Sequence, residues 1–217
     1  DDANRGITIG ASGGTFDVGS GLTLTIANPI AGSGALRKTG DGALALAGIG
    51  LATTAIEVDE GAMTIADGLT VGDVRIGFDG GEASLAVTAG NVAMGTASDR
   101  ANLYVGRTTG DPVTYDNSEG ILDLTGVAQF TAYLDKFEIG VRTSSGNNSY
   151  AVGSVMLAAL NYIDASEVLI SQNAMWYDPA QSALTLGESN TIKTDTFIVG
   201  GNRGNALVEF GAAGGTL

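Results

Sequence analysis

Aromatic and acidic side chains gather in three stretches of the chain, which run from Arg107 to Gly120, from Val141 to Gly153 and from Gln172 to Gln181. These residue types suit sugar recognition, because an aromatic ring stacks on the C–H face of a sugar while a carboxylate binds its hydroxyls. The stretches therefore predict a glycan-binding platform. Its candidate residues are Tyr115, Asp116, Tyr150, Trp176 and Tyr177.

The same aromatic residues admit a simpler role, in which the rings fold down and seal the loops against the body of the protein. Both interpretations require only that the three stretches lie side by side. The sequence alone leaves both of them open.

Catalysis and metal binding are further alternatives for the acidic residues. Asp116, Glu119 and Asp123 lie close in sequence, and a pair of carboxylates can perform acid–base chemistry without histidine. Asp111, Asp116 and Glu119 could offer oxygen ligands to calcium, although the chain has no EF-hand loop and no G-G-x-G-x-D array. We expect no catalytic residue, no metal ligand and no cofactor. A polysaccharide lyase or hydrolase, and a calcium site, are the alternatives.

The composition excludes several classes of site. The chain has no cysteine and no histidine, which removes disulfides, Ser-His and Cys-His pairs, and zinc sites built on those residues. The formal net charge of −14, with only 10 Lys and Arg residues, disfavours nucleic acids and anionic membrane surfaces. No apolar run approaches the roughly 18 residues of a transmembrane helix.

The elements that would position the loops are written as a repeat. Short apolar runs close at positions 77, 106, 140, 171 and 200, at intervals of about 29 to 34 residues. A period in this range is typical of a solenoid, in which each unit buries its apolar face only against its neighbours. Most of the closing residues are glycines, which supply the positive φ of tight turns.

The two C-terminal units align with each other without a gap, 155–171 on 184–200. Their apolar runs predict three short strands per coil, so that equivalent residues stack in ladders about 4.8 Å apart. The two asparagines of the alignment should bond their amides along the axis of the stack. The predicted ladder pairs are Leu157 with Leu186, Asn161 with Asn190, and Ile163 with Ile192.

Residues 32–48 read Gly-Ser-Gly-Ala-Leu-Arg-Lys-Thr-Gly-Asp-Gly-Ala-Leu-Ala-Leu-Ala-Gly. This stretch resembles the passenger-associated repeat of bacterial autotransporters, whose pattern is G-x-L-x-K-x-G-x-G-x-L-x-L-x-G. The resemblance covers only these residues, and it implies a right-handed parallel β-helix displayed outside a Gram-negative cell. Residues 74–210 use a different repeat, which looks like those of large bacterial surface proteins built from β-strand arrays.

We therefore predict an all-β fold, a right-handed parallel β-helix (β-solenoid) with about three short strands per coil of roughly 20–34 residues. Residues 1–217 are expected to form a single solenoid segment of a longer protein. Autotransporter-type repeats would occupy 1–73, and degenerate repeats of roughly 29–34 residues would occupy 74–217.

The expected function is that of a structural or adhesive segment of a secreted, cell-surface β-solenoid that displays loops along one edge. The alternatives are a carbohydrate-binding or polysaccharide-degrading β-helix, and a subunit of a filament or surface layer. The expected partners are neighbouring repeats or subunits of the same protein and an extracellular glycan or host surface. Nucleic-acid binding and membrane insertion are not expected, and the expected location is extracellular, on a bacterial cell surface.

Overall fold

The computed structural model of this 217-residue chain describes residues 6–48, 51–109, 117–143, 149–172, 181–202, 204–211 and 215–217. Within these residues the regular structure consists of strands alone. They are β1 (Ile7–Ile9), β2 (Gly14–Asp17), β3 (Thr23–Ile26), β4 (Ile30–Gly32), β5 (Leu36–Thr39), β6 (Ala43–Leu46), β7 (Leu51–Val58), β8 (Gly61–Ile65), β9 (Leu69–Phe78), β10 (Glu82–Val87), β11 (Asn91–Met94), β12 (Ala101–Thr108), β13 (Ser118–Asp123), β14 (Gln129–Arg142), β15 (Ala151–Met156), β16 (Leu160–Ile170), β17 (Ser182–Leu186), β18 (Ser189–Val199) and β19 (Ala206–Phe210).

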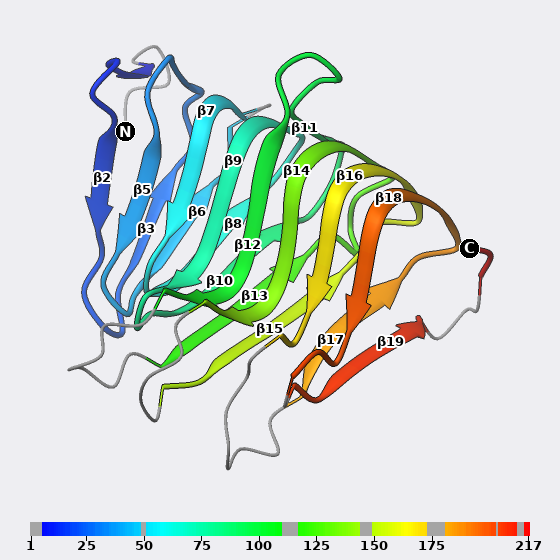
Figure 1. The fold of residues 1–217 in the computed structure, drawn as a ribbon. Helices are drawn as coiled ribbons and strands as arrows, with labels where there is room; N and C mark the ends of the chain where they lie inside the picture. The colour runs from blue at the N-terminus through cyan, green and yellow to red at the C-terminus, as the bar shows by residue number, and fades with distance from the viewer. Residues whose placement is uncertain are drawn as a thin grey trace.

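The strands form a parallel β-helix, which confirms the predicted fold class. One main sheet has eight strands in the order β19-β17-β15-β13-β10-β8-β6-β3. The other has the nine-stranded order β18-β16-β14-β11-β9-β7-β5-β2, with β12 pairing β9 and β14 beside it. All the strand pairs are parallel, and the strands between the two ends of each main sheet pair with the coils before and after them; Figure 1 shows the coils stacked in chain order.

Long strands of the nine-stranded sheet bend in the middle and thereby supply two of the three faces of a coil. Along β14 and β16 the pairs run from Gln129 with Leu160 to Leu134 with Ala165, and they resume at Lys136 with Glu167. The unpaired residue between the two halves turns the chain through a corner. We call the two halves the first and the second face of the nine-stranded sheet.

The core is a column of apolar side chains from successive coils. On the eight-stranded sheet, residues of six coils lie in one register row, and each is at most 3% exposed: Leu44, Met63, Leu85, Leu122, Val155 and Leu184. The coil from Leu44 to Met63 is only about half as long as the coil from Leu85 to Leu122. The coils therefore vary in length while the buried row stays in register, because the extra residues lie in the connections.

The closing positions found in the sequence are left-handed turns. Gly77, Gly106, Gly140 and Gly200 have φ of 60–71°, and Ser171, the one that is not glycine, has φ of 56°. Glycine is required there for space as well, since a Cβ on Gly106 would lie 1.7 Å from the Val152 carbonyl oxygen. The repeat of the sequence is thus a repeat of backbone conformation.

Replacing Ser171 with glycine should stabilise the fold. The left-handed conformation costs a non-glycine residue about 1–2 kcal/mol, which glycine avoids. Glycine in turn loses more conformational entropy on folding, which offsets about 0.5–1 kcal/mol of this gain. The Ser171 hydroxyl is also buried without a hydrogen-bond partner. We expect Ser171→Gly to raise the free energy of unfolding by about 1 kcal/mol in guanidinium titrations. Gly106→Ala should lower it by at least about 3 kcal/mol, and a neutral or destabilising Ser171→Gly would contradict the assignment.

Lys38, the lysine of the autotransporter-like motif, points into the body of the protein and is fully buried. Its ammonium group donates hydrogen bonds to the carbonyl oxygens of Thr39 (3.1 Å), Gly40 and Glu60 (2.9 Å). Burial lowers the pKa of Lys38, and the nearby carboxylates, Glu60 first, offset part of this effect. The lysine therefore ties together the two turns that follow β5 and β7.

Lys38→Met should destabilise the protein by about 1–3 kcal/mol at neutral pH, because it leaves three carbonyl groups without their donor. The pKa of Lys38 is lower in the folded protein than in the unfolded chain, so the unfolded chain binds more protons between the two values. The contribution of Lys38 to the free energy of unfolding therefore rises with pH up to about 10.5, and the stability deficit of Lys38→Met relative to the wild type should grow over that interval. Guanidinium titrations of the wild type and of Lys38→Met across this range measure the deficit, and a pH-independent deficit would contradict the prediction.

Candidate functional site

The predicted glycan platform falls largely on residues outside those the structure describes. Tyr115, Asp116, Trp176 and Tyr177 are among them, so the platform stays a prediction at those positions. Tyr150 is described, and it is half-buried. Its hydroxyl donates a 2.7 Å hydrogen bond to Glu119 Oε1 on the preceding coil, so this ring lies against the coil.

The acidic residues considered for catalysis are not brought together in the described part of the chain. Glu119 and Asp123 lie on β13 four residues apart, which corresponds to about 13 Å along an extended strand. Acid–base pairs of glycosidases lie about 5–9.5 Å apart. The Asp123 carboxylate accepts hydrogen bonds from Thr125, and Asp111 and Asp116 lie outside the described residues. Among those that are described, no group of three or more acidic side chains could hold a metal ion.

The three variable connections leave the coil at one corner. They join β12 to β13, β14 to β15 and β16 to β17, from the second face of the nine-stranded sheet to the eight-stranded sheet. At the same corner of the earlier coils only two residues separate β7 from β8, and three separate β9 from β10. The strands on both sides of the variable connections remain in register. The connections thus start and end beside one another.

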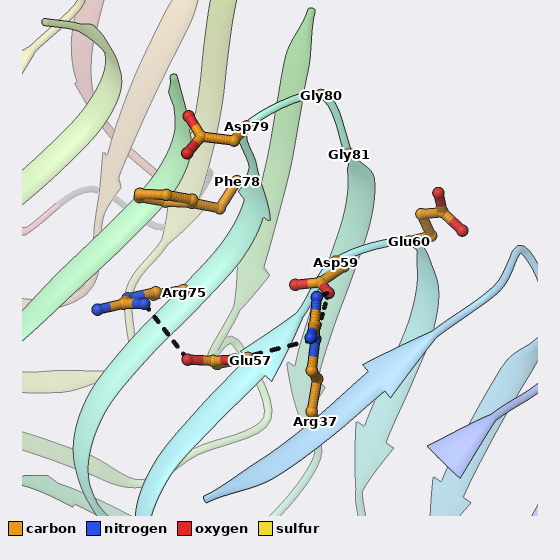
Figure 2. A pocket seen from close by; sticks show the side chains of 9 residues that line it. All are labelled: Arg37, Glu57, Asp59, Glu60, Arg75, Phe78, Asp79, Gly80 and Gly81. Carbon is orange, nitrogen blue, oxygen red and sulfur yellow. Dashed lines mark hydrogen bonds and ion pairs between the residues drawn. The ribbon is translucent and has the colours of Figure 1, made fainter. Parts of the chain in front are cut away.

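A groove with a volume of ≈430 Å³ lies at this corner, on the earlier coils (Figure 2). It is built from the ends of β5, β7 and β9 and from the two short turns that follow β7 and β9. Its lining residues are Arg37, Glu57, Asp59, Glu60, Arg75, Phe78, Asp79, Gly80 and Gly81.

Ion pairs across the coils hold the charged side chains of the groove. Arg37 lies next to Glu57 in the register, and Glu57 lies next to Arg75. Arg37 pairs closely with Asp59, with Nη2 2.5 Å from Oδ2, and Arg75 Nη1 lies 3.3 Å from Glu57 Oε1. All four side chains are partly exposed, and surface pairs of this kind contribute little to stability. Their main effect is to fix the orientation of both guanidinium groups.

Phe78 connects the groove to the next coils through ring contacts. The guanidinium carbons of Arg75 and Arg107 lie 5.4 and 5.3 Å from the centre of the Phe78 ring. Arg107 also lies 4.6 Å from the centre of the Tyr104 ring and forms a 2.5 Å ion pair with the buried Glu138. Burial, followed by the charge of Glu138, raises the pKa of Tyr104. Charged and aromatic side chains therefore form one continuous row over successive coils.

The far ends of the groove touch the first variable connection. Asp79 has a left-handed φ of 47°, and its carboxylate accepts hydrogen bonds from the amide (2.6 Å) and hydroxyl (2.9 Å) of Thr109. The amide of Gly80 donates a 3.0 Å hydrogen bond to the Ser118 hydroxyl. Thr109 and Ser118 flank the connection from β12 to β13, so both of its ends are attached to the rim of the groove.

A second polar region lies at the corner between the two faces of the nine-stranded sheet. Residues 95–100 form an insertion between β11 and β12, and Arg100 extends from it over the following coils. Its guanidinium donates to the carbonyl oxygens of Leu134 (2.8 Å) and Asp164 (2.7 Å) and to Asp164 Oδ1 (2.8 Å). Because these partners belong to two different coils, Arg100 acts as a clamp across the stack. Sequence analysis missed this role, since no repeat position corresponds to it.

The structure brings the predicted ladder residues together. Ile163 lies opposite Ile192 in the register, and Leu157 and Leu186 are both at most 4% exposed. Asn161 Nδ2 donates to Asn190 Oδ1 at 2.8 Å, and Asn190 Nδ2 continues the series with a 2.9 Å bond to the Thr216 carbonyl oxygen. In the coil before Asn161 the same position is Phe130, so the amide series begins at Asn161.

Loss of Asn190 should cost more stability than loss of Asn161. The Asn190 amide also bonds the amide and carbonyl groups of Gly187, at 3.1 and 3.0 Å, whereas Asn161 has one further bond, to Ala158. We expect losses of about 3 kcal/mol for Asn190→Ala and about 1–2 kcal/mol for Asn161→Ala in denaturant titrations. Thr191→Ala, on the exposed side of the same strand, is the control. Equal stabilities of Asn190→Ala and Thr191→Ala would show that the amide series contributes nothing.

Comparison of the chain with protein-family models, curated proteins and solved structures gives no match. The likeness of residues 32–48 to the autotransporter repeat therefore stays a resemblance of a short motif. Among the residues that the structure describes, no helix is long and apolar enough to cross a membrane.

Proposed function

We propose that this chain is a structural and adhesive segment of a secreted β-solenoid on a cell surface, which displays loops along one edge. The observation that carries the proposal is that each coil separates a constant buried core from a connection of variable length. The buried rows keep their register from coil to coil, while the connections at one corner vary in length. A scaffold of this kind tolerates change in its loops without loss of its core.

The exterior of the coils supports the same proposal. Cross-coil contacts such as Arg107 with Glu138 and Arg100 with Asp164 connect different coils of the stack. Each contact links residues that are distant in sequence, and together with the parallel ladders they oppose the peeling of one coil from the next. A stiff rod that holds its loops at a fixed spacing suits adhesion, because loops on successive coils can engage one partner together.

The display role is tested by exchanging loops while leaving the coils intact. Three variants of the full chain replace residues 110–116, 144–148 or 173–180 with glycine and serine at unchanged length. We expect all three to keep the wild-type β-sheet circular dichroism and to lose less than about 1 kcal/mol of stability. At least one should lose adhesion of chain-coated beads to glycan-coated surfaces or cell monolayers.

The matched control places a glycine-serine segment, similar in length to the exchanged loops, between Tyr133 and Leu134 inside β14. It shows whether the coils tolerate foreign sequence as the loops do. It should unfold or aggregate, because the insertion interrupts pairing with both neighbouring coils. Full adhesion by all three loop variants would contradict the display role. Unfolding of the loop variants would contradict the separation between loops and core.

A further inference from the structure

We propose that the groove lined by Arg37, Glu57, Arg75, Phe78 and Asp79 binds an uncharged saccharide. This inference rests on the proposed adhesive function and assigns a ligand class and a binding site to it. The site differs from the platform predicted from the sequence, because its residues come from β5, β7, β9 and the turns that follow β7 and β9.

The groove combines an apolar ring with hydrogen-bonding groups of both kinds. Figure 2 shows the Arg75 guanidinium beneath the Phe78 ring, with its one marked interaction directed to Glu57. A guanidinium has five N–H donors, so Arg75 keeps donors for a ligand. The carboxylates of Glu57, Glu60 and Asp79 are acceptors. A sugar needs this combination, because it presents hydroxyl donors and acceptors around an apolar C–H face.

The charge of the groove disfavours an anionic ligand. Two arginines and four carboxylates line it, and each arginine already pairs with a carboxylate. Glu60 faces the Lys38 ammonium, but Asp79 forms no ion pair with a residue that lines the groove, and the chain has a formal net charge of −14. A uronate, sulfate or phosphate group would therefore meet repulsion both locally and at a distance. An uncharged saccharide avoids this cost.

The side chains of the groove are held in place before a ligand arrives. Asp59 and Glu57 orient the arginines, Phe78 packs against the guanidinium groups of Arg75 and Arg107, and Thr109 holds the Asp79 carboxylate. The two turns also lie tightly together, since a Cβ on Gly81 would be 1.8 Å from the Asp59 carbonyl oxygen. Preorganised groups lose little conformational entropy when they bind. The volume of ≈430 Å³ is in the range of small-molecule sites.

The test is surface plasmon resonance on the immobilised 217-residue chain, with uncharged gluco- and galacto-oligosaccharides and with uronic-acid oligosaccharides of the same length. We expect the uncharged compounds to bind, with an affinity that changes less than about twofold between low and high salt. Phe78→Leu keeps an apolar side chain but removes the ring, and Arg75→Gln removes the charge at a partly exposed position. Each should weaken binding about tenfold, which corresponds to about 1.4 kcal/mol.

Tyr133→Leu is the matched control. Tyr133 is a half-buried aromatic residue on the first face of the nine-stranded sheet, away from the groove, and its ring contacts that of Tyr162 on the same face. It should bind within about twofold of the wild type. Preference for uronic acids, the absence of saccharide binding, or equal binding by Tyr133→Leu, Arg75→Gln and Phe78→Leu would overturn the inference. Phe78→Leu chains that adhere to surfaces as firmly as wild-type chains would overturn the groove while leaving the adhesive function standing.

Discussion

The parallel stacking of coils in register is the constraint on which the rest of this structure depends. A single coil has two open edges and cannot bury its own apolar side chains, so each turn of the chain is stable only against its neighbours. The backbone meets this constraint at the corners, where Gly77, Gly106 and Gly140 take left-handed conformations. At Gly106 and Gly77 a Cβ would collide with the carbonyl oxygen of a neighbouring coil, so the corner is as closely packed as the core.

The same register also organises the exterior. Residues that are about one coil apart in sequence become direct neighbours, and any charge must be compatible with the residue above and below it. Glu57 lies between Arg37 and Arg75 for this reason, and the buried Glu138 is reached by both Arg107 and Lys136. An unpaired carboxylate at the position of Glu138 would be costly, since burial disfavours the charged form. Charge pairing on the surface is therefore a consequence of stacking.

Much of the fold could be predicted from the sequence, because it depends on patterns that the chain repeats. The gap-free alignment of the two C-terminal units placed Asn161 on Asn190 and Ile163 on Ile192, and the register agrees. The candidate site could not be found in this way. Arg37 lies in the autotransporter-like motif and Arg75 in the run that closes at position 77, and no shared motif connects them with Glu57. Their association depends on register across three coils, which a search for local clusters of aromatic and acidic residues does not detect.

The groove and the variable connections share a corner for a physical reason. Where β7 and β9 end, the chain turns within two or three residues, and the small residues Gly80 and Gly81 leave the ends of Arg75 and Phe78 uncovered. In the next coil the connection after β12 is longer, and its two ends attach to Asp79 and Gly80. A short turn beside a long one creates a step in the outline of the stack. A side-chain groove at such a step is open to a ligand and is supported from below by the core, which is the arrangement that rigid binding sites require.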